Sequence, residues 1–376
     1  MLYGKGVARL LSLDALRGIT VAAMVLVNNP GTWRAVYPPL RHADWHGWTL
    51  TDLVFPFFLF IVGVSIPLSL GPRAGEGQDR PVLARVLRRS AVIFLLGMVL
   101  NGFPWFDWAT LRIPGVLQRI ALCYLAAALV YLATGWRGQA WAAAGLLVGY
   151  WALMTLVPVP GYGAGDLGKA GNLAAYIDRT LLGSAHLWQQ AKVYDPEGLL
   201  STLPAIATTL LGVLAGGWVA SEHPPKAVAA GLAGAGLAAT VLGAGWGLWF
   251  PINKALWTSS YALFTAGLAA VTLSGCYWLV EARSLRRWAW PFAWFGVNAL
   301  ALFFLSTLAA KVLLLVRVGP EATRLHAWLF ERLFAPWAVS LNASLASVSF
   351  AWALAYVLIW WGAMWLMFRL GLRLRA

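Results

Sequence analysis

Two of the five histidines, His42 and His46, lie four residues apart in a polar segment, and Asp52 follows just before a long apolar run. Imidazole titrates near neutral pH, so a histidine placed here can act as a general base or as a nucleophile. An ionisable residue at the edge of an apolar run indicates a functional site by default. The same residue types also suit a polar rim at a membrane surface, and this segment alone favours neither interpretation.

Asp14 and Arg17 form a second polar pair, near the start of the first apolar run. Residues three apart on a helix share a face, so the pair fits a structural ion pair or a cytoplasmic site for an anionic ligand. Asn28 ends the same run, and we expect its side-chain amide near the His42 segment.

Charged and amide side chains also gather in three later stretches, 112–119, 158–198 and 250–261. Paired acids in the middle stretch suit an amine or polyol substrate, although solvated loop charge would give the same composition. No phosphate-binding glycine pattern, nucleophile elbow or metal-ligand spacing occurs, so no metal site is predicted. The candidate side chains of these stretches are Arg119, Asp178, Asp195, Glu197, Asn253 and Lys254.

The composition places these residues in a membrane protein. Of the 376 residues, 60% are hydrophobic and 11% are charged, and the mean hydropathy is +0.71. Soluble domains carry about 25% charged residues, so an ordinary soluble, disordered or collagen-like chain is excluded. Long apolar runs without strand-like alternation also exclude an outer-membrane barrel. The net charge of +14 fits loops that face anionic lipid, and we predict the bilayer, not nucleic acid, as the partner.

Apolar windows predict an all-α polytopic transmembrane bundle of about ten helices. The expected spans are Ile19–Asn29 (extended back through Leu10), Leu53–Leu70, Ser90–Phe103, Ile120–Trp136, Gln139–Val157, Leu199–Ser221, Ala227–Phe250, Ala255–Val280, Trp288–Val316 and Ala343–Phe368.

Charge sorting predicts that both termini are cytoplasmic. With that orientation, the inner loops hold more than half of the 28 Lys and Arg residues, most densely at 80–89 and 283–287. The outer loops are longer, and long ordered loops usually carry function. All the polar stretches except the Asp14 pair then fall on the outer side, where Trp45 suits either sugar stacking or an interfacial belt. These outer loops are 30–52, 104–119, 158–198 and 317–342, and the last has room for a short interfacial helix.

Seven segments, in order, together resemble the heparan-α-glucosaminide N-acetyltransferase family and its bacterial relatives. They span about residues 9–265, whereas 266–376 match only as helices, and we expect one domain over 1–376. The segments are SLDALRG at 12–18, VNNPG at 27–31, HADWHGWTLTDLVFPFFLFIVGVSI at 42–66, RIPGVLQR at 112–119, AAYIDRTLLG with His186 at 174–186, YDPEGLL at 194–200 and PINKALWTSSY at 251–261.

The resemblance implies an enzyme that takes acetyl groups from cytosolic acetyl-CoA and transfers them to the amine of a glucosamine on the other side of the membrane. It implies His42 as the catalytic histidine and Asn28 as the nearby asparagine, although the spacing between them is longer here by a few residues. His46 stands where the family has an asparagine, as a second polar contact or a bystander. A bacterial inner-membrane location is expected, and a homodimer is left open.

Chemistry suggests a role for each remaining candidate. His42 would remove the amine proton or carry the acetyl group itself, and Asn28 would donate to the developing oxyanion. Asp52, Asp195 and Glu197 would orient His42 or hold the amine and the sugar hydroxyls. We expect Arg119 and Lys254 mainly to balance those acids. The predicted acetyl-CoA group is Asp14, Arg17, Arg88, Arg89 and Arg119, and the predicted acceptor group is Trp45, His46, Asp178, Asp195, Glu197, Asn253 and Lys254.

Two alternatives stay open at this stage. A sugar transporter would also carry polar residues near helix ends, but it would move substrate without a donor. An O-acyltransferase of cell-envelope glycans would use the same histidine on a hydroxyl group.

Overall fold

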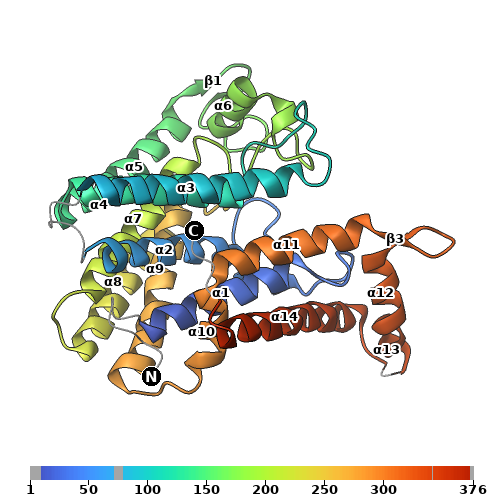
Figure 1. Ribbon diagram of the computed structural model, residues 1–376. Coiled ribbons are helices and arrows are strands. Elements are labelled where there is room, and N and C mark those ends of the chain that lie inside the picture. Colours follow the sequence, from blue (N-terminus) through green and yellow to red (C-terminus); the bar gives the residue numbers. More distant parts are fainter. Residues whose placement is uncertain (1–9, 72–78, 341, 373–376) are drawn as a thin grey trace.

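The computed structural model describes residues 10–71, 79–340 and 342–372, and its regular structure is almost entirely helical (Figure 1). The longer helices are α1 (Leu11–Asn28), α2 (Leu50–Leu70), α3 (Asp79–Gly102), α4 (Val116–Ala133), α5 (Trp136–Leu156), α7 (Thr202–Val219), α8 (Pro225–Trp246), α9 (Ser259–Tyr277, continued by the π-helical η4, Trp278–Ala282), α11 (Ala299–Leu315) and α14 (Leu345–Arg369). The shorter elements are η1 (Pro38–Leu40), α6 (Leu173–Leu182), η3 (Ser184–His186), α10 (Ala289–Val297), α12 (Leu325–Leu333), α13 (Ala335–Ser340) and the antiparallel pairs β1 (Pro158–Val159) with β2 (Gly163–Ala164) and β3 (Arg317–Val318) with β4 (Thr323–Arg324).

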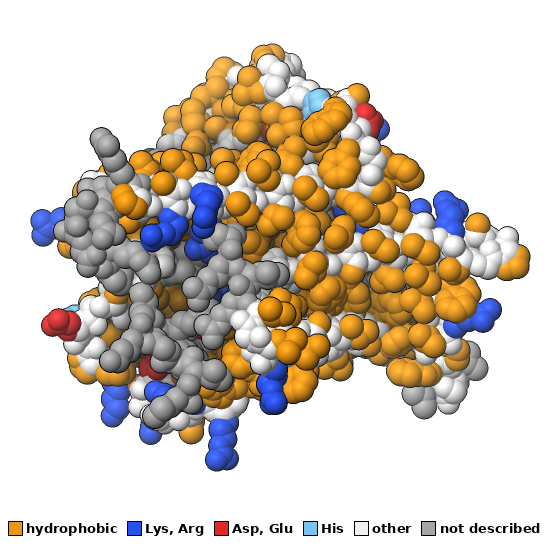
Figure 2. Space-filling view, viewed as in Figure 1, with side chains coloured by type: hydrophobic (Ala, Val, Ile, Leu, Met, Phe, Trp, Pro, Cys, Tyr) orange, Lys and Arg blue, Asp and Glu red, His pale blue; other side chains and the backbone are white. Residues whose placement is uncertain are grey.

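The prediction of an all-α polytopic bundle is confirmed. Within the described residues, eight helices are long and apolar enough to cross a membrane, or nine if the bent pair α10–α11 is one span. The remaining predicted span, Ser90–Phe103, lies in α3, which is not among these helices because it begins at Asp79 and includes Arg85, Arg88 and Arg89 in its first half. Figure 2 shows a broad hydrophobic surface between two ends that carry the Lys and Arg side chains, as a chain embedded in lipid requires.

One predicted span is wrong as a continuous helix. The window Trp288–Val316 divides into α10 and α11, which meet at an angle of 75°. Asn298 lies at the junction with a non-helical backbone, and its side-chain amide donates to the carbonyl of Leu372. Hydropathy alone does not register this break, because a single asparagine scarcely changes the mean of a long apolar window. The segment 317–342, predicted to lie on the outer side, does hold short helices, α12 and α13, as the sequence allowed.

Glycines let the central helices approach one another closely. A Cβ at Gly63 would lie 2.0 Å from the carbonyl oxygen of Thr209, and one at Gly212 would lie 2.1 Å from that of Phe60, so α2 and α7 touch through their backbones. Gly18 of α1 meets α10 in the same way. Small residues serve this purpose in membrane helices, where lipid is as apolar as the side chains. The close packing of α7 on α2 supports the helix whose first turn carries Asp52.

Candidate functional site

Asp52 lies in the first turn of α2 and is almost fully buried, with 1% of its side chain exposed. Its Oδ1 is 2.7 Å from Nδ1 of His42. Its Oδ2 accepts hydrogen bonds from the backbone N–H of Ala43 at 3.0 Å and of Thr49 at 3.0 Å, and from the Thr49 hydroxyl at 3.1 Å. A carboxylate at a helix N-terminus with four such partners is held as the anion and in one orientation.

His42 is 46% exposed, although its acidic partner is buried. An ionised Asp52 accepts the proton of Nδ1, and this assigns the neutral tautomer with the lone pair on Nε2. Such a ring can remove a proton at Nε2 or form a bond there, with the carboxylate stabilising the charged ring. The predicted link between His42 and Asp52 is therefore present in the structure.

The loop before α9 holds the histidine segment in place. Gly47 donates to the carbonyl of Ile252 at 2.7 Å and has a φ of +97°, a backbone conformation that favours glycine. Asn253 is fully buried, and its side chain accepts from the N–H of Leu256 at 2.9 Å and lies 3.4 Å from Nδ1 of His46. Burial lowers the pKa of His46. Asn253 thus fastens two loops, a role that fits its burial better than contact with a substrate.

Lys254 extends from this loop onto the His42 ring. Its Nζ lies 3.0 Å from Nδ1 and 3.3 Å from Nε2 of His42, and 3.6 Å from Oδ1 of Asp52. Burial lowers the pKa of Lys254, and the charges of Asp52 and Glu197 oppose this effect. The site therefore combines an imidazole, a buried carboxylate and an ammonium group whose charged form is incompletely solvated.

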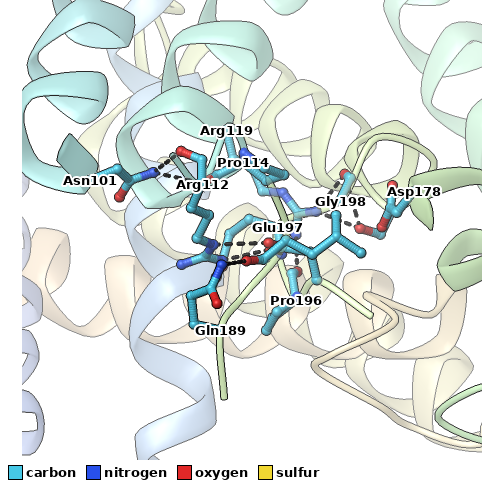
Figure 3. A network of polar contacts seen from close by, with 12 residues as sticks. Asn101, Arg112, Pro114, Arg119, Asp178, Gln189, Pro196, Glu197 and Gly198 are labelled. Carbon is cyan, nitrogen blue, oxygen red and sulfur yellow. Dashed lines mark hydrogen bonds and ion pairs between the residues drawn. The ribbon is translucent and has the colours of Figure 1, made fainter. Parts of the chain in front are cut away.

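Figure 3 shows a second charge cluster, built on Arg112 and Glu197, and Glu197 interacts electrostatically with Lys254. Arg112 donates to both oxygens of Asp195, at 2.9 and 2.6 Å, and to Glu197 at 2.5 Å. Burial acts against the charge of the Arg112 guanidinium, but the two carboxylates raise its pKa well above the ordinary value. Burial likewise favours a neutral Glu197, but Arg112 and its neighbours hold the pKa of this acid below its usual range. Glu197 is therefore anionic, and both acids are committed largely to Arg112.

Arg119 and Asp178 both bond to the backbone of the loop that carries Asp195 and Glu197. Arg119 is 1% exposed and donates to the carbonyls of Pro196 at 2.9 Å and Gly198 at 3.0 Å. Asp178 accepts from the N–H of Leu199 at 2.8 Å, and burial raises its pKa to about 7. These contacts hold the loop through its backbone, and the charge of Arg119 also helps to lower the pKa of Glu197, in line with the balancing role expected of Arg119. They assign Asp178 no part in the His42 cluster.

An aromatic group flanks the histidine segment. The rings of Trp45 and Tyr194 are 5.0 Å apart, and Trp188 lies 6.0 Å from Tyr194. The indole N–H of Trp45 donates to the carbonyl of Leu167 at 2.9 Å, which fixes its plane. All three rings are only partly buried, and the Lys169 ammonium stands 5.6 Å above the centre of the Trp45 ring.

The predicted inner residues lie on other elements. Arg17 donates to Asp14 at 2.9 Å, which confirms the expected pairing, and also to the hydroxyl of Ser65 at 2.7 Å. Arg88 and Arg89 are exposed on α3, and the Arg89 guanidinium stands 4.9 Å above the ring of Tyr124. Both belong to the basic first half of that helix.

Asn28 lies exposed at the end of α1. Among the described residues, no hydrogen bond joins it to His42. Its proposed role at the oxyanion therefore stays a prediction.

Sequence reasoning missed Arg112, Thr49 and Tyr261 as supporting residues. Thr49 precedes Asp52 by three positions, a spacing typical of a capped helix start that could have identified it. Tyr261 donates its hydroxyl to the backbone carbonyl of Asp52 at 2.5 Å, from 209 residues away. No local signal reveals such a contact.

Comparison with known proteins gives one consistent result. Residues 9–250 match the family described as heparan-alpha-glucosaminide N-acetyltransferase, catalytic. The human protein named heparan-alpha-glucosaminide N-acetyltransferase is 31% identical, over 78% of this chain and 52% of its own length. The mouse protein of the same name is 32% identical, over 78% of this chain and 53% of its own length. The chain thus spans about half the length of these curated relatives.

Proposed function

Because this chain belongs to the heparan-α-glucosaminide N-acetyltransferase family, we propose that it is a multi-pass membrane acetyltransferase. It would move an acetyl group from cytoplasmic acetyl-CoA to the amine of a glucosamine-type sugar on the opposite side. The observation that carries this proposal is the pair of a half-exposed His42 and a buried Asp52, 2.7 Å apart, at the outer end of α2. A general base oriented by a buried acid is the machinery that acyl transfer needs.

The proposed reaction uses Nε2 of His42. In direct transfer, the ring removes a proton as the free amine attacks the thioester carbonyl, and the resulting intermediate expels the coenzyme A thiolate, which takes the proton from the ring. In the alternative, Nε2 attacks the thioester first and the amine then attacks the acetyl-imidazole. Asn28 would donate to the oxyanion in either course, as the family resemblance implies, a role worth about 3 kcal/mol.

Recognition of the acceptor would fall to the outer loops. A sugar presents an apolar face and a rim of hydroxyl groups, so Trp45 and Tyr194 suit the ring. Asp52 supplies negative charge near the amine, and Glu197 supports this surface through its ion pair with Arg112. His46, Asp195, Asn253 and Asp178 would support this surface mainly by holding the loops.

Recognition of the donor would fall to the inner side. The phosphates of acetyl-CoA cannot enter lipid, so the donor needs a basic entrance. Arg88 and Arg89 are exposed on the basic first half of α3, and Arg17 lies deeper, beside Asp14 and Ser65. We propose these residues for the donor path, in one domain with both termini cytoplasmic, and a bacterial inner membrane as the location.

The test is transfer of labelled acetyl from acetyl-CoA to glucosamine by the purified protein in detergent. Wild type, His42→Ala and His223→Ala are compared, the last as a control on the exposed loop between α7 and α8. We expect transfer by wild type and the control, and its loss in folded His42→Ala. Transfer by His42→Ala would contradict the assigned role of this histidine.

The same assay separates the rival functions. No transfer by folded wild type to any of a panel of amino sugars would refute N-acetylation. Donor-dependent labelling of sugar hydroxyls would then indicate an O-acyltransferase, and donor-independent uptake into proteoliposomes would indicate a transporter. Enclosing the acetyl-CoA on one side of the proteoliposome tests the proposed sidedness.

A further inference from the structure

Lys254 forms an ion pair with Asp52 at 3.6 Å, but this contact is longer than its contacts with the His42 ring. The carboxylate of Asp52 already receives four donors, from His42, Ala43 and twice from Thr49. The Lys254 ammonium lies nearer to both nitrogens of the His42 ring, at 3.0 and 3.3 Å, than to the Asp52 carboxylate, at 3.6 Å. A lysine whose only purpose was to balance Asp52 would sit on the carboxylate, so its position asks for another explanation.

The distances place the ammonium above the ring of His42. A point in the ring plane this close to both nitrogens would overlap a ring carbon, so Nζ must stand out of the plane, over the ring. The lone pair of Nε2 lies in the ring plane and points elsewhere. The lysine therefore leaves the reactive position of His42 open while holding a positive charge beside it.

The backbone that presents Lys254 is rigid. Asn253, which precedes it, is fully buried and donates its N–H to the hydroxyl of Thr258 at 3.0 Å. The carbonyl of Lys254 accepts from the N–H of Trp257 at 3.0 Å, and the Trp257 side chain is 1% exposed. A donor held in advance needs little reorganisation when charge develops next to it, and this is the requirement for stabilising a transition state.

We propose that Lys254 is a catalytic residue whose ammonium receives the negative charge that forms on the acetyl carbonyl oxygen. This proposal rests on the function proposed above. As the amine nitrogen bonds to the carbonyl carbon, the π electrons move onto the oxygen, and His42 Nε2 takes one amine proton. The oxyanion forms over the His42 ring, within reach of Nζ. When the C–S bond breaks, the carbonyl re-forms, coenzyme A leaves as the thiolate and Lys254 keeps its proton throughout. An acetyl group carried on Nε2 would place its oxygen against the same ammonium.

The test compares Lys254→Met with Lys192→Met in the full-length protein. Lys192 is an exposed lysine of the outer loop between η3 and α7, so its variant controls for the loss of one positive charge. We expect Lys254→Met to lower kcat by about 10²- to 10³-fold, the effect of removing one oxyanion donor. Its Kd for acetyl-CoA should stay within about threefold of wild type, because the charge develops only in the transition state. Lys192→Met should match wild type in both quantities.

Three results would overturn the proposal. One is wild-type kcat in Lys254→Met, and another is an equal loss of kcat and of acetyl-CoA affinity, which a structural lysine would give. If Lys254→Met does not bind acetyl-CoA because it is misfolded, Lys254→Gln, which also removes the charge, provides the same comparison, and the third refuting result is a wild-type kcat in that variant. Absence of transfer by wild type would instead refute the proposed function, so the two failures are distinguishable.

Discussion

Replacing Asp52 with asparagine tests whether this acid sets the state of His42. Asp52→Asn keeps the shape of the side chain and an oxygen for the N–H groups of Ala43 and Thr49, but it removes the charge. An amide that presents its NH2 to His42 requires Nδ1 as an acceptor. The ring proton then moves to Nε2, the atom that must remove a proton or attack the donor.

The magnitude follows from the contacts. A hydrogen bond to a charged group contributes about 1.5–3 kcal/mol, and about 1.4 kcal/mol corresponds to a factor of ten. The wrong tautomer adds to this loss, and in the serine-protease triad the same substitution costs about 10⁴ in kcat. His42 is 46% exposed, so water can partner the turned ring and moderate the loss. We expect kcat to fall by about 10²- to 10³-fold.

The assay is steady-state transfer of labelled acetyl to glucosamine, with Thr49→Val as the matched control. That variant removes the hydroxyl bond to Asp52 at 3.1 Å but keeps the carboxylate and its contact with His42, so we expect less than a tenfold change in kcat. The reasoning is refuted if folded Asp52→Asn keeps more than about a tenth of wild-type kcat. It is also refuted if Thr49→Val is as severe.

Three further predictions concern stability and are checked by tryptophan fluorescence during heating in detergent. The pKa of Asp178 is raised to about 7 from 3.8 in the unfolded chain, so the free energy of unfolding should fall as pH rises through that window. Asp178→Asn should flatten this dependence of stability on pH and gain up to about 4 kcal/mol above pH 7. An unchanged dependence on pH would count against this reasoning. Arg112→Met leaves two buried carboxylates without their partner and should lose about 3–5 kcal/mol, whereas an unshifted melting temperature would show that other groups hold this loop. A Cβ at Gly18 would lie 1.8 Å from the carbonyl oxygen of Phe292, so Gly18→Ala should lose about 1–3 kcal/mol, while Gly149→Ala, with open space around it, should not.

Most of the helical architecture could be predicted because a membrane-spanning helix needs a long apolar stretch, which the sequence shows directly. Apolar windows located nine of the long elements, and Asp79–Gly102 was recognised only from Ser90 because its first half is basic. The bend at Asn298 could not be predicted, since it depends on a partner carbonyl at Leu372. Sequence windows average over the residues where such tertiary contacts decide the backbone.

Residue types identified the candidate site more readily than its connections. His42 and Asp52 lie ten positions apart and could be paired from chemistry and proximity. Lys254 reaches His42 across 212 positions, and only the placement of α9 against α2 brings them together. For that reason the sequence suggested charge balance for Lys254, whereas the distances favour a position over the reactive ring.

The His42–Asp52 site and the Arg112 cluster are linked through Lys254. Lys254 interacts electrostatically with both Asp52 and Glu197, and a lysine drawn to Glu197 would leave the ring of His42. Arg112 engages Glu197 at 2.5 Å and Asp195 in bidentate fashion, so it removes the competitor.

Removing the charge of Glu197 should distinguish two roles of Arg112, which are to hold the loop and to keep Glu197 from attracting Lys254. If Arg112→Met frees Glu197 to attract Lys254, kcat should fall even where the variant remains folded, and adding Glu197→Gln should restore part of it. A structural defect alone would not be relieved by removing a second polar partner, because the unfilled space around Asp195 would remain. Partial recovery of kcat in the double variant would therefore show that the outer ion pairs act on the His42 site through Lys254, and no recovery would restrict Arg112 to holding the loop.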